Sequence, residues 1–78
     1  MADNLQLPPT YREIAELITA AIDEGLYPYG SLLPSAQVLA TRYDVSKTTI
    51  HRAMTLLSRE GTIVGRQGRG RYVARRPS

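Results

Sequence analysis

The sequence contains no cysteine, no tryptophan and no phenylalanine, and it has one histidine. The lack of cysteine excludes disulfide bonds, thiolate zinc sites and cysteine nucleophiles. A lone histidine leaves few nucleophile–base pairs or metal-ligand sets, so we expect no enzyme, no metal and no cofactor. No apolar run approaches the ~18 residues of a membrane helix. The first residues also lack the features of a signal peptide, so we expect a cytoplasmic protein with no membrane partner.

Acidic residues are scarce in the second half of the chain. Residues 1–44 carry two arginines against six acidic residues, whereas residues 45–78 carry seven arginines and one lysine against Glu60 alone. The net charge of +3 therefore combines a segment of −4 with a segment of +7. Guanidinium groups match phosphate oxygens, so the basic half favours a polyanionic partner. A solvated basic surface would have the same composition.

The 78 residues fit one domain, and its first helix is predicted to begin after Thr10. Thr10 and Glu13 have the spacing of a capping box, and Gly25 can take the left-handed conformation that ends a helix. Residues 1–9 lack periodicity and are expected to form a flexible arm. Apolar side chains recur at helical spacing and should form the packed face. They are Tyr11, Ile14, Ala15, Leu17, Ile18, Ala21 and Ile22.

Two more helices are predicted after a connector that is punctuated by proline and glycine. Ser35 and Ser46 are good N-caps for helices at 36–43 and 47–59. Two helices separated by so short a break are typical of a helix-turn-helix, whose second helix places its N-terminal part in the major groove of DNA. The residues expected to pack inward are Val38, Leu39, Ala40, Ile50, Ala53, Met54 and Leu57.

A β-hairpin is predicted to follow, with strands at 62–66 and 71–74 and a glycine-containing turn at 67–70. Residues 31–33 could form a further short strand. Arginines at a hairpin tip can enter a narrow minor groove, although they could also only block edge pairing. The order predicts a mainly α fold with a small β-hairpin: a winged helix-turn-helix of three helices, a short strand and a two-stranded wing, over residues 10–74. Residues 75–78 are expected to be a disordered basic tail.

Four segments carry a family resemblance. They are GSLLPS at 30–35 with Leu39-Ala40, VSKTTIHRAM at 45–54, Leu57 with Glu60-Gly61, and RQGRG at 66–70 with Val73. With the first helix, they make residues 11–74 resemble the DNA-binding domain of the GntR family of bacterial transcription regulators.

The resemblance implies sequence-specific binding of double-stranded DNA, with helix 47–59 in the major groove and wing 66–71 in the minor groove. It also implies a homodimeric full-length regulator, expected to be a repressor, on a pseudo-palindromic operator. We expect this chain to be a fragment without the effector-binding domain, and monomeric alone. The candidate DNA-binding residues are Ser35, Gln37, Ser46, Lys47, Thr48, Thr49, His51, Arg52, Arg66, Gln67, Gly68, Arg69, Gly70 and Arg71.

Departures from the family motif concern its basic positions. Ala36 and Gln37 replace a Glu-Arg pair, and Lys47 and His51 each replace an arginine. Lysine cannot form the bidentate fork of arginine, and a neutral histidine brings no charge. We therefore expect an altered target sequence and weaker phosphate contacts at the second helix, with more of these contacts made by the wing and the tail.

Two other functions stay open at this level. Winged helices also serve as protein-interaction modules, for which Tyr27-Pro28-Tyr29 would be the candidate surface. Single-stranded RNA recognition usually stacks bases on exposed aromatic side chains. Tyr11, Tyr43 and Tyr72 are expected at the core or its edge. Tyr27 and Tyr29 are expected in the connector, away from the basic face, which disfavours that function.

Overall fold

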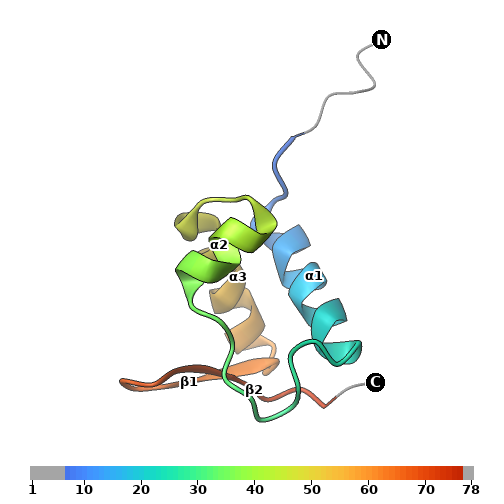
Figure 1. Ribbon diagram of the computed structural model, residues 1–78, viewed down its shortest axis with the longest axis vertical. Helices are drawn as coiled ribbons and strands as arrows, with labels where there is room; N and C mark the ends of the chain where they lie inside the picture. Colours follow the sequence, from blue (N-terminus) through green and yellow to red (C-terminus); the bar gives the residue numbers. More distant parts are fainter. Residues whose placement is uncertain (1–6, 77–78) are drawn as a thin grey trace.

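The computed structural model describes residues 7–76 and contains three helices followed by a hairpin. The elements are α1 (Tyr11–Asp23), α2 (Ala36–Tyr43), α3 (Lys47–Arg59), β1 (Ile63–Arg66) and β2 (Gly70–Val73). The helices pack above the hairpin, which projects to one side (Figure 1). The predicted winged helix-turn-helix is confirmed. Expectations for residues 1–6 and 77–78 lie outside the described residues.

The helix starts follow from local capping chemistry. Thr10 Oγ1 accepts a hydrogen bond from the Glu13 amide at 3.2 Å, and Glu13 Oε1 accepts one from the Thr10 amide at 2.8 Å, so the capping box is confirmed. Ser35 and Ser46 cap α2 and α3 as predicted, each accepting from the amide three residues later. These caps satisfy amides that have no partner inside the helix.

The core lies between α1 and α3 and is closed by α2, the connector and the base of the hairpin. Its fully buried large side chains are Ile14, Ile18, Ile22, Leu39, Ile50, Met54, Leu57, Ile63 and Val73. Burial of such a side chain contributes about 1.5–3 kcal/mol. The prediction that Leu17 and Val38 pack inward is wrong, since they are 48% and 46% exposed. Both side chains lie on the solvent side of their helices, so the packed face of each helix is narrower than its set of apolar residues.

The hairpin is wider at its base than a two-stranded ribbon. Ile63 pairs with Val73 and Arg66 with Gly70, so β1 begins one residue later than predicted and β2 lies one residue earlier. Leu32 forms an isolated antiparallel bridge with Tyr72, so the connector has a single bridged residue where a short strand at 31–33 was considered. The strand β2 therefore lies between β1 and the connector, and this attaches the wing to the body of the domain.

Residues 75 and 76 make defined contacts, which differs from the disorder expected of them. The Arg75 guanidinium binds the Asp23 carboxylate through two contacts, Nε to Oδ1 at 3.0 Å and Nη2 to Oδ2 at 3.1 Å. The Arg76 guanidinium lies 4.7 Å from the centre of the Tyr29 ring. The Asp23 and Arg75 positions are 52 residues apart, so no local pattern could indicate their pairing.

No helix in the described range, residues 7–76, has the length and apolar character needed to cross a membrane.

Candidate nucleic-acid interface

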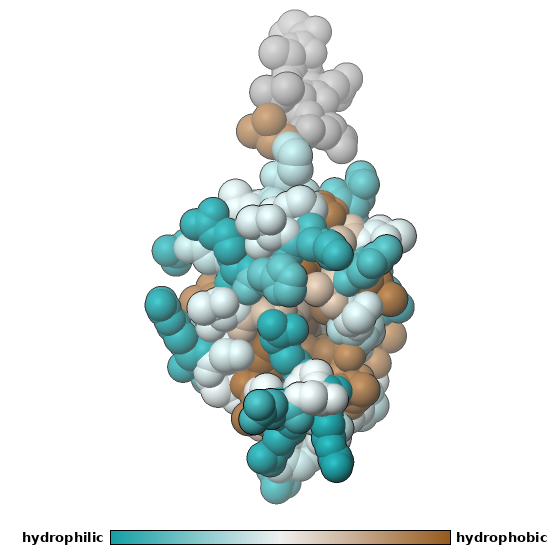
Figure 2. Space-filling model, turned by 90° about the vertical axis from the view of Figure 1, so that its left-hand side faces the viewer, coloured by the Kyte–Doolittle hydropathy of each residue, from teal (hydrophilic) through white to brown (hydrophobic). Residues whose placement is uncertain are grey.

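The start of α2, the start of α3 and the tip of the wing lie on the same side of the molecule, at the left of Figure 1. We call this side the wing face. Figure 2 looks onto it and shows hydrophilic side chains over much of its area, including the projecting wing at the bottom. All the candidate residues are exposed except Thr49 and Arg71, which are half-buried. The fold thus places side chains from three separate segments on one accessible face.

The first turn of α3 presents a mixture of free and engaged side chains. Ser46 Oγ accepts from the Thr49 amide at 3.1 Å and lies 3.1 Å from Thr49 Oγ1, so these two hydroxyls bind each other and the helix start. Lys47, Thr48 and His51 are exposed. Lys47 and His51 are four residues apart and share one side of the helix. The unpaired amides at this helix start also favour a phosphate group.

Gln37 and Lys47, two of the departures from the family motif, line the same depression. An open depression between α2 and α3 is lined by Gln37, Ala40, Thr41, Asp44, Val45 and Lys47. A glutamine amide can both donate to and accept from a base edge, and lysine can donate to guanine or phosphate. Asp44 adds a carboxylate to this basic and polar site. It is also held in the left-handed conformation, with φ of 56°.

The wing tip is a glycine-containing turn with basic flanks. The Arg69 amide donates to the Arg66 carbonyl at 3.0 Å, which closes the turn. Gly68 and Gly70 have positive φ of 75° and 108°, conformations that other residues rarely adopt. Arg66, Gln67, Arg69 and Tyr72 line an open depression at this tip. The arrangement presents guanidinium groups on a narrow ribbon.

The structure separates Arg52 from the other candidates of α3. Its guanidinium lies 4.7 Å from the centre of the Tyr11 ring, and the Arg12 guanidinium lies 5.6 Å from the same ring. These residues, together with Thr55, Leu56 and Arg59, line a depression between α1 and α3. Sequence reasoning missed Arg12 and Arg59 as members of a basic patch. Their proximity depends on helix packing, which no local motif indicates.

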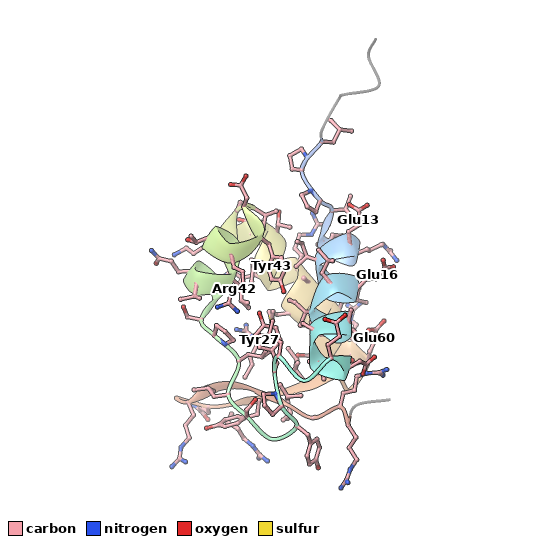
Figure 3. All side chains as sticks on the ribbon, turned by 45° about the vertical axis from the view of Figure 1, so that its right-hand side comes forward. Glu13, Glu16, Tyr27, Arg42, Tyr43 and Glu60 are labelled. Atoms are coloured by element: carbon pink, nitrogen blue, oxygen red, sulfur yellow. The ribbon has the colours of Figure 1, made fainter. Side chains whose placement is uncertain are left out.

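Acidic side chains lie mainly on the other side of the molecule. Glu13, Glu16 and Glu60 extend from the α1 side, away from Arg42 on α2 (Figure 3). Glu16 and Glu60 line a groove between α1 and α3 together with Asp23. The charge asymmetry of the sequence is thus partly reproduced in the fold, with Asp44 as an exception on the wing face and Arg75 beside Asp23 as an exception on the other side.

The connector tyrosine that was expected on a protein-binding surface is buried. Tyr27 is only 5% exposed, and Arg42 Nη1 donates to its hydroxyl at 2.7 Å (Figure 3). Burial, and then a hydrogen bond to Tyr27, raise the pKa of the neighbouring Tyr43 above its usual value. Tyr29, at 51% exposed, is the only residue of Tyr27-Pro28-Tyr29 with an exposed aromatic ring. The prediction of an aromatic surface at this segment is therefore wrong for Tyr27.

The part of the chain that the structure describes holds no group of three or more histidine, aspartate or glutamate side chains arranged to bind a metal ion.

Comparison with known proteins gives a consistent match. The sequence model described as "Bacterial regulatory proteins, gntR family" matches residues 10–73. The uncharacterized HTH-type transcriptional regulator YurK of Bacillus subtilis (strain 168) is 34% identical over 73 residues, which cover 94% of this chain and 30% of YurK. The chain therefore spans about a third of the length of that relative.

Solved structures share the fold. A GntR family transcriptional regulator from Listeria monocytogenes superposes with a TM-score of 0.79 and 36% identity, covering 85% of this chain and 58% of the other. The crystal structure of AraR(DBD) in complex with operator ORR3 gives a TM-score of 0.77 and 30% identity, covering 90% of this chain and 83% of the other. The chain belongs to the gntR family of bacterial regulatory proteins, which are transcription regulators rather than enzymes.

Proposed function

We propose that this chain binds double-stranded DNA sequence-specifically, with the start of α3 in the major groove and the wing tip in the minor groove. The observation that carries the proposal is that Gln37 and Lys47 line one open depression, while Arg69 lies at the wing tip, which projects on the same side as the starts of α2 and α3. These residues come from three elements, and a B-form duplex can contact all three at once because its grooves alternate along one side. The structural neighbour AraR(DBD), which was crystallised in complex with an operator, supports double-stranded DNA as the partner.

Each part of the face has a distinct role in this proposal. Lys47, Thr48 and His51 reach base edges or phosphates from the first turns of α3, and Gln37 reads an adjacent base from α2. Ser35, Ser46 and Thr49 fix the helix starts whose amides approach phosphates. The wing contributes its turn and flanks, and an arginine in a narrow minor groove is favoured by the enhanced negative potential there. The wing residues concerned are Arg66, Gln67, Gly68, Arg69, Gly70 and Arg71.

Arg52 has a more peripheral place. It stacks on Tyr11 next to Arg12, and all three residues line the α1–α3 depression. We assign this patch to the phosphate backbone, since cations there add affinity without reading sequence. Arg75 binds Asp23 at the end of α1, which lies away from the wing tip in Figure 1, so we expect Arg75 and its neighbour Arg76 not to contact the same DNA.

The whole regulator is proposed to be a cytoplasmic homodimer on a pseudo-palindromic operator, acting as a repressor. Two-fold symmetric regulators place two recognition helices in successive major grooves. This chain alone should bind single half-sites weakly as a monomer, because the second half-site then adds no avidity. In the alternative of a protein-interaction module, the candidate surface is reduced to Pro28 and Tyr29, because Tyr27 is buried.

The test is selection of bound duplexes from a random DNA pool, followed by titration of the selected sequence at several salt concentrations. The expected result is one enriched half-site and a log-affinity that falls with log-salt by ~0.9 per neutralised phosphate. The variant Arg69→Ala should bind the selected DNA more weakly. A pool without enrichment, together with affinity that ignores salt, would contradict the proposal.

A further inference from the structure

The segment that leaves the wing is fixed to the body of the domain directly after β2. The Ala74 and Arg75 amides both donate to the Thr62 carbonyl, at 2.9 and 3.1 Å. Thr62 is 6% exposed, so this anchor lies against the core rather than in solvent. Backbone hydrogen bonds alone therefore fix the start of the exit segment, residues 74–76, to the body of the domain.

The Arg75 side chain adds a directional contact to this anchor. Its Nε and Nη2 atoms bind the two carboxylate oxygens of Asp23, at the last residue of α1. The two side chains are 36% and 29% exposed, so they are partly withdrawn from water. A bidentate guanidinium–carboxylate pair fixes orientation as well as distance. Arg76 then lies over the exposed ring of Tyr29 and extends the contact to the connector.

The same end of β2 is held on its other edge by the connector. The Val73 amide donates to the Ser31 carbonyl at 2.9 Å, and the Gly30 amide donates to the Val73 carbonyl at 2.8 Å. From Val73 the strand runs back to Gly70 and then to Arg69 at the tip. Because the wing has only two strands, a small rotation at the base of β2 becomes a larger displacement at the tip. The anchoring of the base consequently determines where Arg69 lies.

We infer that Asp23 and Arg75 form an exit clamp that positions the wing for minor-groove contact. This inference rests on the proposed function. The clamp joins the last residue of α1 to the segment that follows β2, and in Figure 1 the end of α1 lies on the side away from the wing tip. Asp23 and Arg75 are therefore positioning residues, and they act through β2 without touching the DNA.

The electrostatic effect and the positioning effect of Asp23→Asn have opposite signs. Removal of a carboxylate makes the domain more positive, which by itself strengthens DNA binding. Loss of the clamp should weaken it. Glu24→Gln is the matched control, because Glu24 is the exposed neighbour and its substitution changes the charge equally. We expect Asp23→Asn to bind the selected half-site about two- to fivefold more weakly than Glu24→Gln, in keeping with one partly exposed ion pair.

The decisive measurement is a double-mutant cycle between the clamp and the wing tip. Arg69→Ala should reduce affinity strongly in the Glu24→Gln background and less in the Asp23→Asn background, because a displaced tip has less contact to lose. If the affinity losses of Asp23→Asn and Arg69→Ala simply added, the clamp would be overturned. Additive losses are what we expect if Asp23→Asn lowers the stability of the domain without displacing the wing tip. All titrations are made where circular dichroism shows each variant folded.

A second readout does not depend on DNA. Amide hydrogen exchange at Val73, Ala74 and Arg75 should be faster in Asp23→Asn than in Glu24→Gln, because the exit segment is released. Equal exchange in the two variants would overturn the clamp. If Arg69→Ala has no effect on binding in the unsubstituted protein, while exchange changes as expected, then the proposed role of the wing fails and the clamp itself stands.

Discussion

The Leu32 side chain packs directly on Gly70, and its Cδ1 lies 3.1 Å from the position that a Cβ at residue 70 would occupy. Gly70 also has φ of 108°, which L-residues with a side chain rarely adopt. The contact joins the connector to the first residue of β2, opposite the exit segment at the other end of that strand. The position of the wing thus depends on both ends of β2.

Gly70→Ala is expected to destabilise the domain by about 1–3 kcal/mol, because it combines backbone strain with a contact that forces Leu32 to move. The melting temperature should fall, and binding of the selected DNA should weaken more than stability alone explains. Gly65→Ala is the control: its added Cβ meets open space, and Gly65 is not among the residues of positive φ. Equal melting temperatures for the two variants would show that neither the backbone strain at Gly70 nor its Leu32 contact matters for stability.

Features that depend on contacts between residues close in the chain could be predicted from the sequence. The capping hydroxyls of Thr10, Ser35 and Ser46 predict three helix starts because a cap bonds to an amide only three residues away. The site was predicted largely through the family motif, which already combines α3 with the wing.

Contacts between distant segments could not be predicted in this way. Nothing in the sequence near Tyr27 indicates that its hydroxyl accepts a hydrogen bond from Arg42. Likewise, nothing near Arg75 indicates that its guanidinium pairs with the Asp23 carboxylate. Hydrophobic periodicity also predicted too many buried residues on α1. Leu17 is apolar and has helical spacing, but it lies outside the strip of the helix surface that packs against the core. The errors therefore fall where packing, rather than local bonding, decides exposure.

Gln37→Arg and Lys47→Arg should each strengthen DNA binding, because each provides the guanidinium fork that the present residue lacks. For Gln37→Arg the salt dependence should also become steeper by ~0.9, the value for one more neutralised phosphate. The two residues line one depression, so the double variant should not show simply additive gains. Glu24→Gln also makes the net charge more positive by one, at an exposed residue outside this depression, and serves as the control. If Glu24→Gln strengthened binding as much as Gln37→Arg does, the gain would come from net charge alone.

Stability should decrease at alkaline pH because of Tyr43. Its pKa is raised above the usual value of 10.0, first by burial and then by the hydrogen bond to Tyr27. Below pH 10 the folded and unfolded states hold this proton equally, so the stabilisation is complete. Above pH 10 the unfolded state loses the proton first, and the free energy of unfolding falls as pH rises.

Urea denaturation between pH 8 and pH 11 measures this decrease. The variant Tyr43→Phe should lose part of the pH dependence, because it has no phenol to ionise at this position. Tyr29→Phe is the comparison, since Tyr29 is exposed. If Tyr43→Phe retains the full alkaline decrease, ionisation of Tyr43 is not its cause.

Asp44 combines an unfavourable backbone conformation with an unfavourable charge. Within residues 7–76 it is the one non-glycine residue with positive φ, and it lies in the depression that Gln37 and Lys47 line. Asparagine tolerates the left-handed conformation as well as aspartate does, so Asp44→Asn should leave the melting temperature nearly unchanged. Removal of the carboxylate from this depression should strengthen DNA binding, and more so at low salt.

Two further variants separate charge from conformation at this position. Asp44→Ala should cost about 1 kcal/mol of stability, because alanine has no polar group to support the left-handed turn, whereas Asp44→Gly should not. All three variants should gain DNA affinity relative to Glu24→Gln, which removes a carboxylate away from the depression. Because local repulsion falls with distance and is screened by salt, the advantage over Glu24→Gln should shrink as ionic strength rises. An Asp44→Asn protein that binds no better than Glu24→Gln at low salt would place the Asp44 carboxylate outside the DNA contact.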